Sequence, residues 1–394
     1  MALLDKFAST AAIRDQLGAD GQDPTDVVID QIFSPTEGLV GGRHTILAGT
    51  NNYLGLTFDP ACVEAGKKAI EEQGTGTTGS RMANGSFATH TALERDLANF
   101  FQLPYGMVFS TGYAANLGTL TALVKTGDTV LLDSHCHASL YDGCQMSGGN
   151  LFRFRHNDIK SLEKRLQLLG DKTENCLLIT EGMYSVLGDT APLAKIVELK
   201  NRYGALLLVD EAHSLGVYGE CGRGVAEAEG VLGEVDFVVG TFSKSLGAMG
   251  GFCVSPHPEL ELIRYVSRPF IFTASSSPSI IASTHEALRQ LRARPELRET
   301  LWRNANHLYE GLKALGLHLG PQVSPVVAVR LGTKEEALSC WNRLLEAGVY
   351  TNLMIPPASP GGFSYLRCSV STAHTPEQLE RIISAFADLK TQLL

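Results

Sequence analysis

The sequence predicts an α/β fold built on a mostly parallel, seven-stranded sheet, followed by a smaller α+β domain. Short apolar runs recur between residues 107 and 254, and several are separated by segments long enough for a helix. Their apolarity is continuous rather than alternating, which indicates strands buried on both faces, as in parallel sheets covered by helices. Glycine supplies 40 of the 394 residues, more than the average of about 7%. This content favours tight turns and close approaches of the backbone to a ligand.

The expected elements of the large domain follow one another along the chain. Residues 1–45 are expected to form a helical lead-in. Asp59 and Pro60 are typical of the start of a helix, which Gly74 would end. The predicted strands of the sheet are Met107–Phe109, Val130–Leu132, Leu151–Phe154, Leu177–Ile179, Leu206–Val209, Phe237–Val239 and Phe252–Val254.

The pattern changes beyond about Pro278, where two long helical segments lead into a different alternation of elements. We therefore expect an N-terminal helical segment (1–45), a large domain (46–277) and a small C-terminal domain (278–394). The later elements expected in the small domain are a strand at Pro325–Leu331, a helix near Lys334–Ala347, strands near Val349–Leu353 and Tyr365–Ser369, and a terminal helix.

Composition excludes several classes of protein. Lys and Arg total 33 and Asp and Glu total 42, so the net charge is −9, which argues against a general nucleic-acid binder. The apolar runs are far shorter than the ~20 residues that span a bilayer, and the N-terminus lacks a signal-peptide pattern. The 8 cysteines form no CxxC pair and no zinc spacing. We therefore expect reduced thiols in a cytoplasmic protein.

Two charged residues follow predicted strands. Asp210 directly follows the run Leu206–Val209. Lys244 comes shortly after the run Phe237–Val239, among small and hydroxylic residues. A carboxylate at the edge of a buried sheet needs a cationic partner. Pyridoxal phosphate would use both groups, because its aldehyde forms a Schiff base with lysine and its protonated ring nitrogen pairs with aspartate.

A third segment could bind the phosphate of such a cofactor. Phe109–Asn116 runs from a strand through a glycine turn into a helix, whose free N–H groups and dipole favour a dianion. The hydroxyls of Thr241 and Ser243 could add two donors. No glycine pattern matches a dinucleotide fingerprint or a P-loop in the required context.

Each signal also has a simpler interpretation. A strand-end aspartate often caps a helix or turn, a lysine can be structural, and a glycine turn before a helix is common. Asp133, His135 and His137 alternate at strand spacing and could converge on a metal, but no second histidine cluster completes a ligand shell. One of these histidines stacked over a planar cofactor is the more coherent interpretation, and no metal is expected.

Several segments together resemble the α-oxoamine synthase family of fold-type I pyridoxal phosphate enzymes. The likeness covers nearly the whole chain from about Ser34 and includes Asn51–Leu56, Gly74–Arg81, Asp210–Ser214, Gly222–Gly224, Gly240–Lys244 and Leu366–Ser369. Within the family the likeness is greatest to the soluble bacterial serine palmitoyltransferases, as in Gly79–Gly85, Phe152–Asn157 and Phe237–Ser245.

The resemblance implies a homodimer with active sites at the subunit interface. In each site Lys244 would hold the cofactor, Asp210 would bind the ring nitrogen and His213 would bind the phenolic oxygen. His137 would stack on the ring and polarise a thioester carbonyl. The phosphate would be surrounded by Gly112, Tyr113, Thr241 and Ser243, with the partner's Thr273.

The resemblance also implies the reaction and the substrate site. Arg367 would bind the amino-acid carboxylate, with Asn51 or Asn52 approaching from the other subunit. Lys244 would remove the α-proton of L-serine, which would condense with palmitoyl-CoA and release CoA and carbon dioxide to leave a 2-amino ketone. Ile355 and Asn51 depart from the serine-using pattern. This leaves alanine, glycine or an acyl carrier protein as alternative substrates, as in 8-amino-7-oxononanoate synthase or 2-amino-3-ketobutyrate CoA ligase, and an aminotransferase as another class.

Overall fold

A computed structural model describes residues 3–18 and 21–389 and contains two compact units. The sheet unit comprises residues 52–185 and 189–299, and the second unit comprises the chain up to Asn51, residues 186–188 and the chain from Thr300. These bounds differ from the expected ones, because the N-terminal segment belongs to the same unit as the C-terminal region. The helix that starts at Pro278 packs instead on a helix of the sheet unit.

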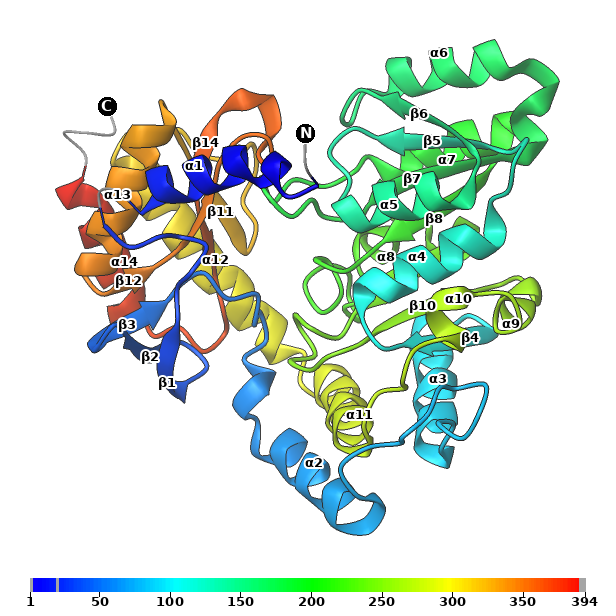
Figure 1. Ribbon diagram of the computed structural model, residues 1–394, viewed down its shortest axis with the longest axis horizontal. Helices are drawn as coiled ribbons and strands as arrows, with labels where there is room; N and C mark the ends of the chain where they lie inside the picture. Colours follow the sequence, from blue (N-terminus) through cyan, green and yellow to red (C-terminus); the bar gives the residue numbers. More distant parts are fainter. Residues whose placement is uncertain (1–2, 19–20, 390–394) are drawn as a thin grey trace. The chain divides into compact units, whose positions relative to one another are not determined.

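The sheet unit is built on seven strands in the order β4-β10-β9-β8-β7-β5-β6 (Figure 1). Pairing is parallel from β9 through β6, and β10 is antiparallel to both of its neighbours. Each strand contains one of the predicted apolar runs, so the predicted mostly parallel sheet is confirmed. The strands are β4 (Tyr105–Phe109), β5 (Thr129–Asp133), β6 (Asn150–Phe154), β7 (Cys176–Glu181), β8 (Leu206–Asp210), β9 (Phe237–Thr241) and β10 (Gly251–Ser255).

Burial differs between the strands of the sheet. All residues of β5, β7, β9 and β10 are buried. In β6 only Phe154 is buried, and Phe152 is 42% exposed. The prediction of burial on both faces is therefore wrong for β6, which lies at one edge of the sheet, where one neighbour is missing. The other edge strand, β4, is buried except at Tyr105 because α3 and α9 pack on it.

Helices complete the sheet unit. Asp59 caps α2 by accepting hydrogen bonds from the backbone N–H groups of Ala61 and Cys62, and Gly74 ends the helix, as the sequence predicts. α4 packs against α5 and against β9 and β10 (Figure 1). The helices are α2 (Pro60–Gln73), α3 (Ala88–Phe101), α4 (Gly112–Leu123), α5 (Ala138–Ser147), α6 (Ile159–Leu169), α7 (Leu193–Tyr203), α8 (Val225–Ala228), α9 (Glu259–Ile263), α10 (Arg268–Ile271) and α11 (Pro278–Ala293), with short 3₁₀ helices η2 (Leu56–Phe58), η3 (Gly170–Asn175) and η4 (Leu232–Glu234).

The second unit contains two small sheets, in the orders β1-β2-β3-β12 and β11-β14-β13. Residues 29–47, expected largely as helix, form three strands, and burial alternates along β2 with the period of two that a half-buried strand requires. Its elements are η1 (Asp5–Phe7), α1 (Ala8–Leu17), β1 (Ile29–Ser34), β2 (Glu37–Val40), β3 (Arg43–Leu47), most of α12 (Glu296–Ala314), β11 (Val326–Leu331), α13 (Lys334–Glu346), β12 (Val349–Tyr350), β13 (Asn352–Met354), η5 (Pro360–Gly362), β14 (Ser364–Ser369) and α14 (Pro376–Asp388).

Within residues 3–18 and 21–389, no helix combines the length and the apolar character needed to span a membrane.

Candidate active site

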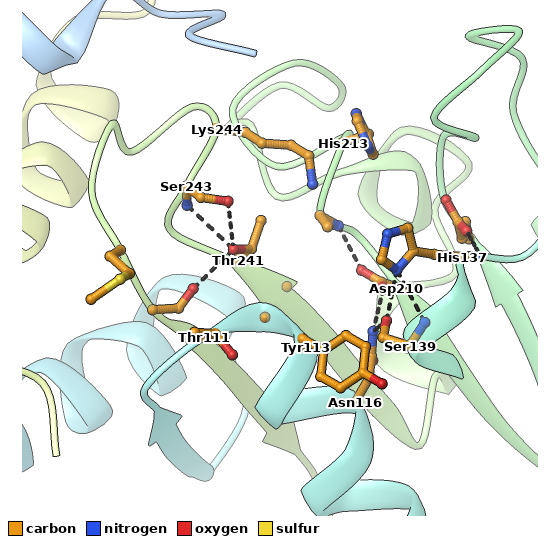
Figure 2. A pocket seen from close by; sticks show the side chains of 16 residues that line it. Thr111, Tyr113, Asn116, His137, Ser139, Asp210, His213, Thr241, Ser243 and Lys244 are labelled. Atoms are coloured by element: carbon orange, nitrogen blue, oxygen red, sulfur yellow. Dashed lines mark hydrogen bonds between the residues drawn. The ribbon is translucent and has the colours of Figure 1, made fainter. Parts of the chain in front are cut away.

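A pocket of about 310 Å³ lies at the carboxyl edge of the seven-stranded sheet (Figure 2). Glu181, Asp210 and Thr241 end β7, β8 and β9, and all three line it. These strands are parallel, so their carboxyl ends meet at one edge, where ligands bind in α/β sheets. The pocket brings together the predicted cofactor residues Gly112, Tyr113, His137, Asp210, His213, Thr241, Ser243 and Lys244.

Asp210 lies deep in this pocket. The residue is 4% exposed. Its Oδ1 accepts a hydrogen bond from the Ala212 backbone N–H (2.9 Å), and its Oδ2 accepts one from Asn116 Nδ2 (2.8 Å). Both donors are neutral, and they fix the orientation of the carboxylate. A buried carboxylate held in this way is suited to bind a cationic ring nitrogen.

His137 is the N-cap residue of α5 and lies on one side of the pocket (Figure 2). Its backbone N–H donates to Glu181 Oε1, and its Nδ1 lies 2.8 Å from Ser139 Oγ. Burial lowers the pKa of His137 from its ordinary value, the charge of Asp210 opposes this shift, and Lys244 adds to it. The imidazole is therefore neutral near pH 7.

The other end of the pocket is suited to an anion. Thr111 caps α4, so the helix begins with its free N–H groups at Gly112 and Tyr113. The hydroxyls of Thr241 and Ser243 lie 2.9 Å apart beside this helix start. A Cβ on Gly112 would come within 2.8 Å of Thr241 Cβ, so glycine keeps the space open. Helix dipole, N–H groups and hydroxyls together would bind a phosphate.

Lys244 and His213 line the pocket between the side that holds Asp210 and His137 and the anion site at the start of α4 (Figure 2). His213 is 6% exposed, and its Nδ1 lies 2.8 Å from the hydroxyl of Tyr53. This bond fixes the imidazole, with Nε2 as its other polar atom. The pocket thus contains an amine, a buried carboxylate and an anion site, the three features that the sequence pattern required.

Not every predicted residue lines this pocket. Thr273 belongs to the same unit but lines a smaller hollow, with Arg81 and Phe270. Asn52 is buried and donates to the hydroxyl of Thr57 (2.7 Å). A contribution of Thr273 or Asn52 to the site of another subunit stays a prediction.

Arg367 and Asn51 belong to the second unit. Arg367 lies on β14, is 5% exposed, and donates to Asn352 Oδ1 (3.1 Å) and Asn51 Oδ1 (2.9 Å). Its buried Nε has no hydrogen-bond partner within the described ranges. A buried guanidinium held by two neutral amide oxygens retains the capacity to bind a carboxylate.

The sequence analysis gave no individual role to several residues that line the pocket, among them Glu181, Asn116 and Ser139. Glu181 carries a signal similar to the one that identified Asp210, because it is a carboxylate that closely follows a predicted apolar run, Leu177–Ile179. Burial, followed by the neighbouring charge of Asp210, raises the pKa of Glu181 well above its ordinary value. Asn116 and Ser139 gave no comparable signal, because amide and hydroxyl groups are common at the starts of helices.

The alternative metal site is not assembled. Asp133 Oδ1 accepts from the His135 backbone N–H (2.8 Å) and lies 2.9 Å from His156 Nδ1. The His135 ring stacks on His156 with centroids 3.9 Å apart, whereas His137 faces the pocket. Within residues 3–18 and 21–389, no three His, Cys, Asp or Glu side chains are placed to hold a metal ion.

Comparisons with known proteins agree with this architecture. Residues 43–386 match the family model for class I and II aminotransferases. The chain is 51% identical over 393 residues to a serine palmitoyltransferase of Caulobacter vibrioides, covering 100% of this chain and 97% of the relative. It is more distant, at 37% identity over 348 residues and 88% of both chains, from an 8-amino-7-oxononanoate synthase of Alkaliphilus metalliredigens.

A solved structure shows the same fold. A serine palmitoyltransferase variant from S. paucimobilis with a bound PLP–myriocin aldimine matches with a TM-score of 0.97 and 47% identity, covering 100% of this chain and 99% of that chain. The predicted fold-type I architecture is therefore confirmed. The chain belongs to the class I and II aminotransferase family, in the α-oxoamine synthase branch that includes the bacterial serine palmitoyltransferases.

Proposed function

We propose that the protein is a pyridoxal phosphate-dependent acyltransferase that condenses L-serine with palmitoyl-CoA. The products would be a 2-amino ketone of the 3-ketosphinganine type, carbon dioxide and CoA. The observation that carries this proposal is the pocket itself, where Lys244, the buried Asp210 and the start of α4 converge. The similarity to serine palmitoyltransferases over the full chain supports the choice of substrates.

The residues of the pocket fit pyridoxal phosphate. Lys244 would hold it through Nζ, Asp210 would bind its ring nitrogen, and His213 its phenolic oxygen. Its phosphate would be bound by Gly112, Tyr113, Thr241 and Ser243. Glycine at residue 112 leaves space for the phosphate beside Thr241, which a side chain would occupy. When bound, this cofactor supplies an electron sink that stabilises negative charge at the substrate α-carbon.

The chain's own groups would then move protons and orient the reactants. Lys244 Nζ would accept the α-proton of the amino acid and later return one. Because Asp210 is buried and anionic, it would keep the ring nitrogen protonated. His137 would direct its Nε2 toward the thioester carbonyl and stabilise the charge that develops on its oxygen.

We assign the amino-acid carboxylate to Arg367. Its guanidinium is buried and held by amide oxygens rather than by an acid of the chain. Ile355 cannot contribute a second positive charge, so this assignment makes Arg367 the main determinant of carboxylate affinity.

We also propose a homodimer in which Thr273 and Asn52 or Asn51 contribute to the partner's site. Several large apolar side chains close to Thr273 in the sequence are exposed in the single chain, as expected for a surface that another subunit covers: Tyr265 is 68%, Val266 60% and Phe272 72% exposed.

A cytoplasmic location is supported by the 8 cysteines, which form no disulfide.

The test is to incubate the purified protein, loaded with pyridoxal phosphate, with palmitoyl-CoA and serine labelled in its carboxyl carbon. We expect free CoA thiol, labelled carbon dioxide and the amino ketone in equal amounts. Alanine, glycine and an acyl carrier protein donor are compared in the same preparation, and a higher kcat/KM for one of these would move the assignment to that alternative. Transamination without thiol release would contradict the proposal.

A further inference from the structure

A chain of hydrogen bonds connects two ionisable side chains that line the pocket, His137 and Asp210 (Figure 2). Asn116 Nδ2 donates to Asp210 Oδ2 (2.8 Å) and to Ser139 Oγ (2.9 Å). Ser139 Oγ in turn lies 2.8 Å from His137 Nδ1. The members come from three elements, because Asn116 lies on α4, Ser139 on α5 and Asp210 at the end of β8.

The direction of each bond follows from the chemistry at one end of the chain. An ionised carboxylate only accepts hydrogen bonds, so the amide nitrogen of Asn116, rather than its oxygen, faces Asp210. The second hydrogen of that nitrogen points to Ser139 Oγ, which therefore accepts. The hydroxyl hydrogen of Ser139 is then left to be donated to His137 Nδ1.

A second donor acts on the same ring nitrogen. The backbone N–H of Ser139 donates to His137 Nδ1 (3.2 Å), which is the capping bond of α5. A ring nitrogen that accepts from two donors carries no proton. In a neutral imidazole the single proton must then be on Nε2.

Burial makes this arrangement specific. Asn116 is 3% exposed and Ser139 is 1% exposed, so bulk water does not offer their polar groups alternative partners. The charges that act on His137 are Asp210 at the end of β8, Lys244 after β9 and Asp142 on α5, and burial is the largest influence and lowers its pKa. The imidazole is neutral, and the tautomer is the property that the hydrogen bonds decide.

We propose that Asn116 and Ser139 are positioning residues that hold His137 in its Nε2–H tautomer and so present a hydrogen-bond donor to the reacting carbonyl. This inference rests on the proposed function, in which His137 acts on the acyl thioester. The opposite tautomer would direct a lone pair at the developing oxyanion and repel it. Asn116 is suited to this role because its amide is neutral and donates twice from one atom.

The test reads the tautomer directly, by ¹⁵N NMR of the holoenzyme labelled at the histidine ring nitrogens. His137→Asn identifies the two resonances of His137. In the wild type we expect an unprotonated Nδ1 and a protonated Nε2. In Ser139→Ala and in Asn116→Ala we expect part of the population to shift to the Nδ1–H tautomer. Ser139→Ala leaves only the longer backbone bond of residue 139 (3.2 Å) on Nδ1, and Asn116→Ala frees the Ser139 hydroxyl oxygen to accept from Nδ1–H.

A matched control and a kinetic measurement complete the test. Thr121→Val removes a hydroxyl from the same helix α4, where Thr121 bonds only the Leu117 carbonyl (2.6 Å) in the described contacts, and should leave the tautomer unchanged. In Ser139→Ala, kcat should fall about tenfold, as for other residues that orient a functional group, while the KM for serine and the cofactor affinity stay within about twofold.

A failure of the tautomer inference and a failure of the proposed function would give different results. An unchanged Nε2–H tautomer in both Ser139→Ala and Asn116→Ala would overturn the inference, because the hydrogen-bond chain would then not decide the proton position. A wild type that releases no CoA from serine and palmitoyl-CoA would contradict the proposed function instead, because the NMR measurement requires no substrate.

Discussion

His137 and His156 both follow strands at the same edge of the seven-stranded sheet, the first after β5 and the second after β6. His137 lies against Ser139 and lines the pocket. His156 lies between two carboxylates, with Nδ1 2.9 Å from Asp133 Oδ1 and Nε2 2.7 Å from Asp189 Oδ2. Burial lowers the pKa of His137. Burial also opposes the charge on His156, but its bonds to Asp133 and Asp189 raise its pKa to about 9.

The difference between the two histidines lies in their partners. A histidine between two acids is charged, and both of its ring nitrogens bond carboxylates, so its role is to stabilise the fold. A histidine held by an amide–hydroxyl chain stays neutral and keeps one nitrogen for a ligand. The same distinction separates Arg367, held by amide oxygens, from Arg81, which forms a buried ion pair with Glu94 (2.9 Å). The two groups that the proposed function assigns to substrate, His137 and Arg367, are thus the ones whose hydrogen-bond partners are neutral.

The largest expected effect is that of Asp210→Asn, which removes the charge next to the neutral chain of Asn116 and Ser139. We expect cofactor to remain bound and turnover to fall on the order of 10²- to 10⁴-fold, the range typical of positioned proton-transfer groups. The measurement is solvent deuterium exchange at the α-carbon of serine. Wild-type exchange in this variant would remove Asp210 from the assigned role.

The second prediction replaces each of the two histidines, His156 and His137, and compares the loss of stability with the loss of turnover. His156→Gln leaves Asp133 and Asp189 buried without a cation, so we expect a loss of about 3 kcal/mol in the free energy of unfolding, with kcat nearly unchanged at a temperature where the variant is folded. His137→Asn keeps a side-chain acceptor at the start of α5 and should lose turnover instead. Urea denaturation and initial rates measure both quantities. A stable His156→Gln with low turnover would show that the comparison is wrong.

The third prediction concerns Arg367 as a cation with neutral partners. Arg367→Ala should raise the KM for serine roughly 10- to 100-fold, as expected for a lost charged hydrogen bond, and should leave cofactor affinity unchanged. Arg330→Ala is the control, because Arg330 lies on the neighbouring strand β11 and its guanidinium stacks on Phe363 with 4.7 Å to the ring centroid. Equal KM values in the two variants would remove Arg367 from the carboxylate site.

The smallest expected effect is a shift in the pH dependence of stability. The pKa of His156 is raised, so its stabilising effect is complete below the ordinary imidazole pKa of about 6.5 and is lost as the pH rises through about 9. His135 and Tyr184 also pack on His156, but Asp133 and Asp189 are the charged groups that bond it.

Asp189→Asn should lower the pKa of His156 and start this loss at lower pH, at a cost of about 1 kcal/mol at neutral pH. The measurement is the free energy of unfolding by urea between pH 6 and about 9.5. Parallel stability curves for wild type and variant would contradict the role of the carboxylate pair.

The sequence predicted the sheet and eight of the residues that converge in the pocket because both depend on local patterns. The buried strands were readable from continuous apolar runs, and Asp210 and Lys244 from their positions after those runs. The strands within residues 29–47 were missed because β1 is largely exposed and because the alternation of buried and half-buried residues in β2 covers only four residues. Asn116 and Ser139 were missed because their role comes from contacts between α4, α5 and β8, which are far apart in the sequence.

The measurement that tests the central claim most directly is borohydride reduction of the protein loaded with pyridoxal phosphate, followed by peptide mass spectrometry. We predict one modified peptide, with the pyridoxyl group on Lys244, and no modification in Lys244→Ala. A label on another lysine, or no label in a protein that binds the cofactor, would contradict the assignment of the pocket.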